Sequence, residues 1–186
     1  MTLTAAVLII GNEILSGGTQ DANVQFLAQR LAARGIKLSE VRIVRDEEPA
    51  IITTVRALSA AYTYVFSTGG IGPTHDDITA ECMAKAFDTK LEINDEARQL
   101  LSAFYQKRNV DLNEGRLRMA RIPVGAELLH TPDSSAPGFK VRNVYVMAGI
   151  PRVMQGMFSQ FEHTLGEAAP MLSKKVCGNL REGDIA

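Results

Sequence analysis

The sequence predicts an α/β fold, a three-layer α/β/α sandwich with a mostly parallel central sheet. An apolar run opens the chain and ends at a glycine, which is the pattern of a strand buried on both faces. Strand-like and helix-like segments then alternate, and the chain contains no internal repeat. This alternation predicts right-handed crossovers that place helices on both faces of a parallel sheet.

Three strand–helix units are expected in the first half of the chain. The expected strands cover residues 3–10, 36–44 and 62–68. The expected helices cover residues 22–35, 49–61 and 78–87. In the first helix, apolar side chains recur at helical spacing between Asp21, a capping residue, and Gly35, which suits a helix end. Pro49 suits the first turn of the second helix.

The second half of the chain is less regular. The expected elements are a helix over 94–107, a short basic helical stretch over 113–123, a hairpin around 127–131, a core strand over 141–147 and a long helix from 148 to Glu167 or beyond. Pro170 ends this last helix. The sequence therefore predicts one domain over residues 1–169, followed over residues 170–186 by a C-terminal tail truncated from a longer whole.

The composition excludes several classes of protein. With 20 Lys and Arg against 21 Asp and Glu, the net charge of -1 offers no basic field to a nucleic-acid backbone. No run approaches the roughly 18 apolar residues of a membrane span, and no basic segment precedes the first apolar run as in a signal peptide. The two cysteines, Cys82 and Cys177, fit no metal or disulfide pattern. We expect a cytoplasmic protein that binds neither nucleic acid nor membrane.

The loops after the first three expected strands are rich in glycine and polar residues. They cover residues 11–18, 46–48 and 69–77. Because ligands of parallel α/β sheets bind outside the carboxyl ends of the strands, we expect these loops to meet at one edge. The glycines of the third loop, GGIGPTHDD, allow backbone N–H groups to approach a phosphate or pyrophosphate. This loop matches neither a Walker A motif nor the spacing of a dinucleotide-binding GxGxxG motif.

Four acidic residues are expected at the same edge: Glu13, Asp46, Asp76 and Asp77. Carboxylates beside phosphates need a cation between them, and Mg²⁺ commonly binds one or two carboxylates together with phosphate oxygens and water. We expect Glu13, Asp76 and Asp77 to bind a divalent metal ion (Mg²⁺, Mn²⁺ or Co²⁺). We expect Asp46, Asp76 and Asp77 to act in catalysis. The pattern suits metal-assisted hydrolysis of a phosphoanhydride.

Simpler interpretations of the same residues remain open. Asp76 or Asp77 can cap the helix that follows, and a tight turn accounts equally well for the paired glycines. Glu13 can be a solvated loop residue, and Asn12 can form an Asx-turn. His75 lies beside the acids and can assist proton transfer, because histidine titrates near neutral pH.

The basic stretch contains Arg116, Arg118 and Arg121. These side chains can bind a phosphate from across the site. A charged helix of this kind is also commonly a solvated face. The sequence leaves both interpretations open.

Six segments resemble one family, in order, over about residues 4–160. They are GNEILSGGTQDAN (11–23), VRDEE (44–48), STGGIGPTHDDITAE (67–81), ARIPVGAELL (120–129), SAPGF (135–139) and VMAGIPRVM (146–154). These segments are similar to the MoaB/Mog-type molybdopterin-binding domain, and within that family to the N-terminal domain of CinA-type competence/damage-inducible proteins. The segment GGIGPTHDDIT is the most specific of the matches.

The resemblance implies a homo-oligomer, a dimer or a trimer, whose ligand is a nucleotide diphosphate or a pterin phosphate. Asp77 and Asp46 match the acids of the family's glycine loop and second-strand loop. The residues expected to bind the ligand are Gly11, Asn12, Glu13, Ser16, Asn23, Thr68, Gly69, Gly70, Gly72, Pro73, Thr74, Ser135, Ala136, Pro137 and Gly138.

Three functions follow as hypotheses. CinA-type domains are similar to metal-dependent enzymes that hydrolyse ADP-ribose to AMP and ribose 5-phosphate, so the first hypothesis is a pyrophosphohydrolase. Mog-type members bind molybdopterin and adenylylate its phosphate, so the second is molybdopterin binding or adenylylation in cofactor biosynthesis. The third is a ligand-binding module without catalysis.

Overall fold

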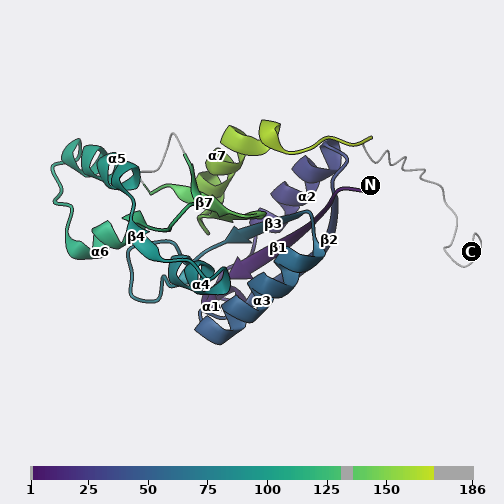
Figure 1. The fold of residues 1–186 in the computed structure, drawn as a ribbon, viewed down its shortest axis with the longest axis horizontal. Coiled ribbons are helices and arrows are strands. Elements are labelled where there is room, and N and C mark those ends of the chain that lie inside the picture. The colour runs from purple at the N-terminus through teal and green to yellow at the C-terminus, as the bar shows by residue number, and fades with distance from the viewer. Residues whose placement is uncertain (1, 131–135, 170–186) are drawn as a thin grey trace, which may run out of the picture.

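The computed structural model describes residues 2–130 and 136–169, and Figure 1 shows its fold. A six-stranded sheet has the strand order β2-β1-β3-β8-β7-β6. Its strands are β1 (Thr4–Ile10), β2 (Lys37–Val44), β3 (Tyr64–Thr68), β6 (Glu127–Leu129), β7 (Gly138–Val141) and β8 (Val144–Met147). The pairs β2–β1, β1–β3 and β3–β8 are parallel, and β8–β7 and β7–β6 are antiparallel. The predicted mostly parallel α/β fold is confirmed.

The helices cover both faces of this sheet (Figure 1). They are α1 (Asn12–Leu15), α2 (Asn23–Ala33), α3 (Glu48–Ala61), α4 (Thr79–Ala86), α5 (Asp95–Gln106), α6 (Glu114–Leu117) and α7 (Pro151–Phe161), with 3₁₀ turns η1 (Arg118–Ala120) and η2 (Glu162–Thr164). Helices α2 and α7 bury one apolar core against the sheet, and α3, α4 and α5 bury the other. The segment from β4 (Leu91–Ile93) through α5 and α6 to β5 (Arg121–Pro123) extends to one side, and β4 pairs with β5.

Strand β1 lies between β2 and β3 in the parallel part of the sheet. Residues Ala5 to Ile10 are all buried, because β1 is sandwiched between β2 and β3 and covered on both faces. The register pairs Ile10 with Val44 of β2 and Ile9 with Thr68 of β3. The carboxyl ends of three strands therefore lie side by side, as the sequence predicts for the loops that follow them.

Asn143 explains one difference between the predicted and the observed strands. The sequence predicts a single strand over 141–147, whereas the chain reverses at Arg142 and Asn143 to form the β7–β8 hairpin. Arg142 adopts a left-handed backbone conformation with φ 52°. The Asn143 side chain donates to the carbonyls of Ser59 (3.0 Å) and Tyr62 (2.8 Å) at the end of α3. This long-range anchor has no periodicity that a sequence pattern could reveal.

The elements around the β6–β7 hairpin also differ from prediction. The hairpin predicted around 127–131 is larger, because β6 pairs with β7 at Gly138–Val141. The last helix ends at Phe161, not at Glu167 or beyond. Thr164 donates to the Phe161 carbonyl (2.7 Å), and the chain then turns so that Leu165 enters the core. The strand β4 and the short helix α1 were expected only as parts of loops.

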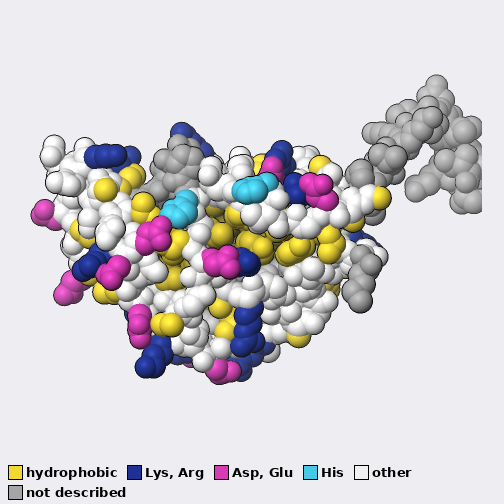
Figure 2. Space-filling model, turned by 45° about the horizontal axis from the view of Figure 1, so that its top comes forward, with side chains coloured by type: hydrophobic (Ala, Val, Ile, Leu, Met, Phe, Trp, Pro, Cys, Tyr) yellow, Lys and Arg dark blue, Asp and Glu magenta, His cyan; other side chains and the backbone are white. Residues whose placement is uncertain are grey.

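Charged side chains of both signs are interspersed over the face shown in Figure 2, around a band of apolar side chains. Among the residues that the structure describes, no helix combines the length and the apolar composition required to cross a membrane.

Phe66 should contribute more to the free energy of unfolding than Phe104 does. Its fully buried ring contacts the rings of Tyr145, Phe158 and Phe161. We expect Phe66→Ala to lower the free energy of unfolding by about 3–5 kcal/mol. The matched control is Phe104→Ala on α5, where the ring lies outside both cores and contacts Tyr105. Urea unfolding followed by circular dichroism measures both, and equal losses would contradict this account.

Candidate functional site

Two glycines directly after β3 build the centre of the site. Gly69 and Gly70 have φ angles of +102° and +67°, in the left-handed region that glycine tolerates. A Cβ atom would lie 2.1 Å from the Ile10 carbonyl oxygen at Gly69 and 2.1 Å from Thr79 Oγ1 at Gly70. Thr79 Oγ1 donates to the Gly69 carbonyl (3.0 Å), and Thr79 N–H donates to the Gly70 carbonyl (3.0 Å). The loop is thereby held between the end of β1 and the start of α4.

This conformation leaves a row of backbone donors available to a ligand. The N–H groups of Gly70, Ile71 and Gly72 have no acceptor within the described part of the chain. Successive backbone N–H groups in a turn form a concavity that binds anions. All three residues line a cavity of about 390 Å³. A volume of this size is within the usual range of small-molecule sites.

The cavity collects most of the acidic and glycine residues that the sequence singles out. Glu13, Asp46, Asp76 and Asp77 all line it. The predicted ligand-binding residues that line it are Gly11, Glu13, Gly69, Gly70, Gly72, Pro73 and Ala136. The predicted meeting of three strand-end loops at one edge of the sheet is therefore confirmed.

Asp46 is the carboxylate most affected by its surroundings. Burial raises its pKa, the charges of Glu13 and Asp76 raise it further, and the hydrogen bond from the Asn12 N–H (2.9 Å) opposes the rise. Asn12 therefore presents its backbone to Asp46 at the start of α1. The carboxylates of this edge repel one another, and a cation or a proton would relieve that repulsion.

Asp77 turns back toward its own loop. Its Oδ2 accepts hydrogen bonds from the Thr74 backbone N–H (2.8 Å) and from the Thr74 hydroxyl. Asp76 has its own interactions, with the Thr74 side chain and with its own backbone N–H, and these lower its pKa. Helix α4 starts after Ile78 without a side-chain cap, so neither acid caps it. The capping interpretation of Asp76 and Asp77 is wrong, and both residues line the larger cavity.

The predicted metal ligands do not form a ready-made cluster. No group of three histidine, cysteine or acidic side chains in residues 2–130 and 136–169 is arranged to hold a metal ion. Glu13, Asp76 and Asp77 line one cavity but do not converge on a point. The site suits an ion held by one or two carboxylates and completed by ligand phosphates and water, which is the usual manner of Mg²⁺.

Asn23 and Thr68 lie in a cavity next to the larger one. The two residues are 3% and 1% exposed. Asn23 Nδ2 donates to the Gly149 carbonyl (2.8 Å), while Asn23 Oδ1 and Thr68 Oγ1 have no partner in the described part of the chain. Both residues and Glu13 line this second cavity. Buried polar atoms without partners indicate a place for water or for a polar group of a ligand.

The remaining predicted ligand-binding residues occupy other positions. Ser16 Oγ donates to the Glu13 carbonyl (3.2 Å), which closes α1. Pro137 lines a smaller cavity beside the first. Gly138 is buried in β7, where a Cβ atom would lie 2.3 Å from the Val146 carbonyl oxygen, so packing alone requires a glycine there. Ser135 lies outside the described residues.

The apolar wall of the larger cavity was not among the predicted ligand-binding residues. Met119, Ala148, Ile150 and Val153 line it. Ile150 is 66% exposed immediately before α7, which is unusual for an isoleucine. The motif VMAGIPRVM contains three of these four residues, but no sequence pattern distinguishes its cavity-lining positions from its core positions.

Comparisons with known proteins define the class of this chain. Residues 6–167 match the family described as a probable molybdopterin binding domain. The chain belongs to this family, the MoaB/Mog-type domains.

Within the family, the chain is similar to CinA-type proteins. A crystal structure of the protein CinA with unknown function from Thermoplasma acidophilum is 32% identical, with a TM-score of 0.79 over 87% of this chain and 96% of that one. The molybdopterin biosynthesis enzyme MoaB from Thermus thermophilus shares the fold, with a TM-score of 0.57 and 16% identity over 88% of this chain and 91% of that one.

The curated relatives are longer than this chain. A putative competence-damage inducible protein of Alkaliphilus metalliredigens is 35% identical over 84% of this chain, which corresponds to 39% of the relative. A protein of Metallosphaera sedula is 36% identical over 92% of this chain and 67% of its own length. The similarity therefore extends over the domain and not over the whole of these relatives.

Asp46→Asn should stabilise the protein at neutral pH. Because the pKa of Asp46 is raised on folding, its ionised form opposes folding, and stability falls as pH rises from the unfolded pKa of about 3.9 through the folded one. The amide removes that cost and can still accept from the Asn12 N–H. We expect a higher melting temperature at pH 7 and a difference that shrinks below about pH 4.

Thermal unfolding between about pH 4 and pH 7 measures the difference in melting temperature between Asp46→Asn and the wild type. The matched control is Asp111→Asn, on the exposed loop after α5. A destabilised Asp46→Asn protein at pH 7 would contradict the account.

Proposed function

We propose that this domain binds a phosphorylated small molecule at the loop after β3 and hydrolyses a phosphoanhydride bond in it, with ADP-ribose as the model substrate. The observation that supports the proposal is the combination, in one cavity, of three unpaired backbone N–H groups with four carboxylates. The N–H groups suit a diphosphate, and the carboxylates suit an attacking water and a divalent cation.

The residues divide into two roles in this proposal. The N–H groups of Gly70, Ile71 and Gly72 hold the diphosphate. Asp76 and Asp77 would hold Mg²⁺, Mn²⁺ or Co²⁺, and the chemistry that the ion would supply is polarisation of a phosphoryl oxygen. Asp46 accepts a proton from the attacking water, and its raised pKa suits a general base. Addition of water across the phosphoanhydride then yields two phosphomonoesters, AMP and ribose 5-phosphate.

Molybdopterin binding or adenylylation is the second candidate function. The family description favours it, and so does the apolar wall formed by Met119, Ile150 and Val153. A planar pterin ring can pack against such a wall while its phosphate occupies the N–H groups. A binding module without catalysis would use the same contacts.

Asp77→Ala should abolish AMP production if the hydrolase proposal is right. The assay incubates the protein with ADP-ribose and Mg²⁺, Mn²⁺ or Co²⁺ in turn and measures AMP by liquid chromatography. We expect activity only with a divalent ion, a loss on the order of 100-fold or more for Asp77→Ala, and full activity for the control Asp111→Ala. Absence of turnover by the wild-type protein with all three ions would refute this function.

A binding assay separates the second candidate from the first. Direct binding of molybdopterin, followed by ATP-dependent attachment of AMP to it, would establish the adenylylating function. Binding without turnover in either assay, retained in Asp77→Asn, would establish a module without catalysis.

A further inference from the structure

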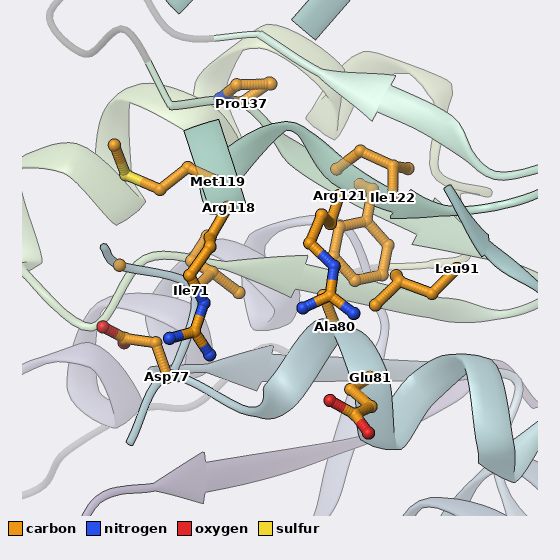
Figure 3. Close-up of a pocket in the computed structure, with 13 residues that line it drawn as sticks. Ile71, Asp77, Ala80, Glu81, Leu91, Arg118, Met119, Arg121, Ile122 and Pro137 are labelled. Atoms are coloured by element: carbon orange, nitrogen blue, oxygen red, sulfur yellow. The ribbon is translucent and has the colours of Figure 1, made fainter. Parts of the chain in front are cut away.

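A small cavity beside the candidate site has no role in the proposal above. It lies between the loop after β3 and the η1 turn (Figure 3). Gly70, Ile71, Gly72, Asp77 and Met119 line both this cavity and the larger one. The two cavities therefore share the wall that carries the unpaired backbone N–H groups.

Arg118 and Arg121 line the small cavity from the opposite side. Figure 3 shows both guanidinium groups directed across it toward Asp77 and Glu81. Both residues are half-buried, and neither side chain has a hydrogen bond or an ion pair with any residue in the described ranges. A guanidinium carries five N–H donors and stays charged. Two half-buried guanidinium groups without acceptors leave room for an anion between them and the loop.

Arg116 is the third arginine of the basic stretch over residues 113–123, and it serves as a comparison for Arg118 and Arg121. Arg116 donates to the Asp111 carbonyl (2.6 Å), and its guanidinium lies 4.9 Å from the centre of the Tyr105 ring. These two contacts hold its guanidinium against the end of α5 and the loop that follows. The sequence alone could not separate Arg116 from Arg118 and Arg121, but the structure does.

No carboxylate in the described ranges forms an ion pair with the two arginines. The hydrogen bond from Lys85 is the main cause of the lowered pKa of Glu81, and the charges of Arg121 and Arg118 lower it further. Glu81 pairs with Lys85 at 2.9 Å, and Asp77 accepts from Thr74. Among the described residues that line the two cavities, Arg118 and Arg121 are the only basic ones, whereas Glu13, Asp46, Asp76, Asp77 and Glu81 are acidic. A phosphate held by the loop would therefore need these arginines to offset the surrounding carboxylates.

We propose that the small cavity is a phosphoryl subsite in which Arg118 and Arg121 bind a phosphate group of the ligand whose remainder occupies the larger cavity. The inference deepens the proposed function and rests on it for the identity of the ligand. The small cavity is far smaller than its neighbour, so it suits a single phosphoryl group and not a ring. Hydrolysis of a diphosphate converts each phosphate to a monoester with a second ionisation near pH 6, which binds arginines more strongly.

The test measures binding of inorganic phosphate and of ribose 5-phosphate by isothermal titration calorimetry, without a metal ion. We expect Arg118→Gln and Arg121→Gln each to weaken binding about tenfold or more, because each removes charge-assisted hydrogen bonds. Arg118→Lys and Arg121→Lys keep the charge but lose the bidentate geometry, so intermediate affinities are expected.

The matched control is Arg98→Gln on α5, whose guanidinium pairs with Asp95 on the same helix, and it should bind phosphate like the wild type. Thermal melts without phosphate verify that each variant is folded. Absence of phosphate binding by the wild-type protein, or unchanged affinity in both glutamine variants, would overturn the subsite.

These experiments distinguish a failure of the hydrolase proposal from a failure of the phosphoryl-subsite proposal. Phosphate binding that depends on Arg118 and Arg121, without turnover of ADP-ribose, supports the subsite and refutes the hydrolase. Turnover of ADP-ribose with phosphate binding unaffected by both substitutions supports the hydrolase and overturns the subsite.

Discussion

The close approach of the backbone after β3 to the end of β1 is the constraint on which the site depends. At Gly69 the chain passes so near the Ile10 carbonyl that no side chain fits, and Thr79 then ties the loop to α4 by two hydrogen bonds. Because β1 pairs with both β2 and β3, this contact also sets the distance between the loops that follow all three strands. The residues with unpaired N–H groups and the carboxylates line one cavity as a consequence.

Electrostatic strain accompanies this arrangement. Four carboxylates line one cavity, and the raised pKa of Asp46 records both the loss of solvent and the repulsion from Glu13 and Asp76. The strain is tolerated because the surrounding sheet is buried on both faces and holds the strand ends in place. In the proposed function, a cation and a phosphate relieve the repulsion together, which couples binding of one to binding of the other.

Local patterns were sufficient for most of the fold and part of the site. Alternating apolar segments predicted β1 to β3 and α2 to α4, since strand and helix periods are visible over a few residues. They failed where distant groups decide the structure. The Asn143 side chain bonds the β7–β8 hairpin to the end of α3, and the chain turns after α7 so that Leu165 enters the core. Capping of α4 by Asp76 or Asp77 was a reasonable local interpretation, but Asp77 bonds to Thr74 instead.

The sequence by itself determined the class of fold, the family and the residue types at the edge of the sheet. Glycines, acids and buried strands leave local patterns, and the segment GGIGPTHDDIT lies within residues 6–167, which match the family. Only the tertiary structure decided which of these residues share a cavity, that Glu13, Asp76 and Asp77 form no closed metal cluster, and that Arg118 and Arg121, but not Arg116, face the glycine loop. The physical reason is that cavities and unpaired donors arise from contacts between segments far apart in the chain.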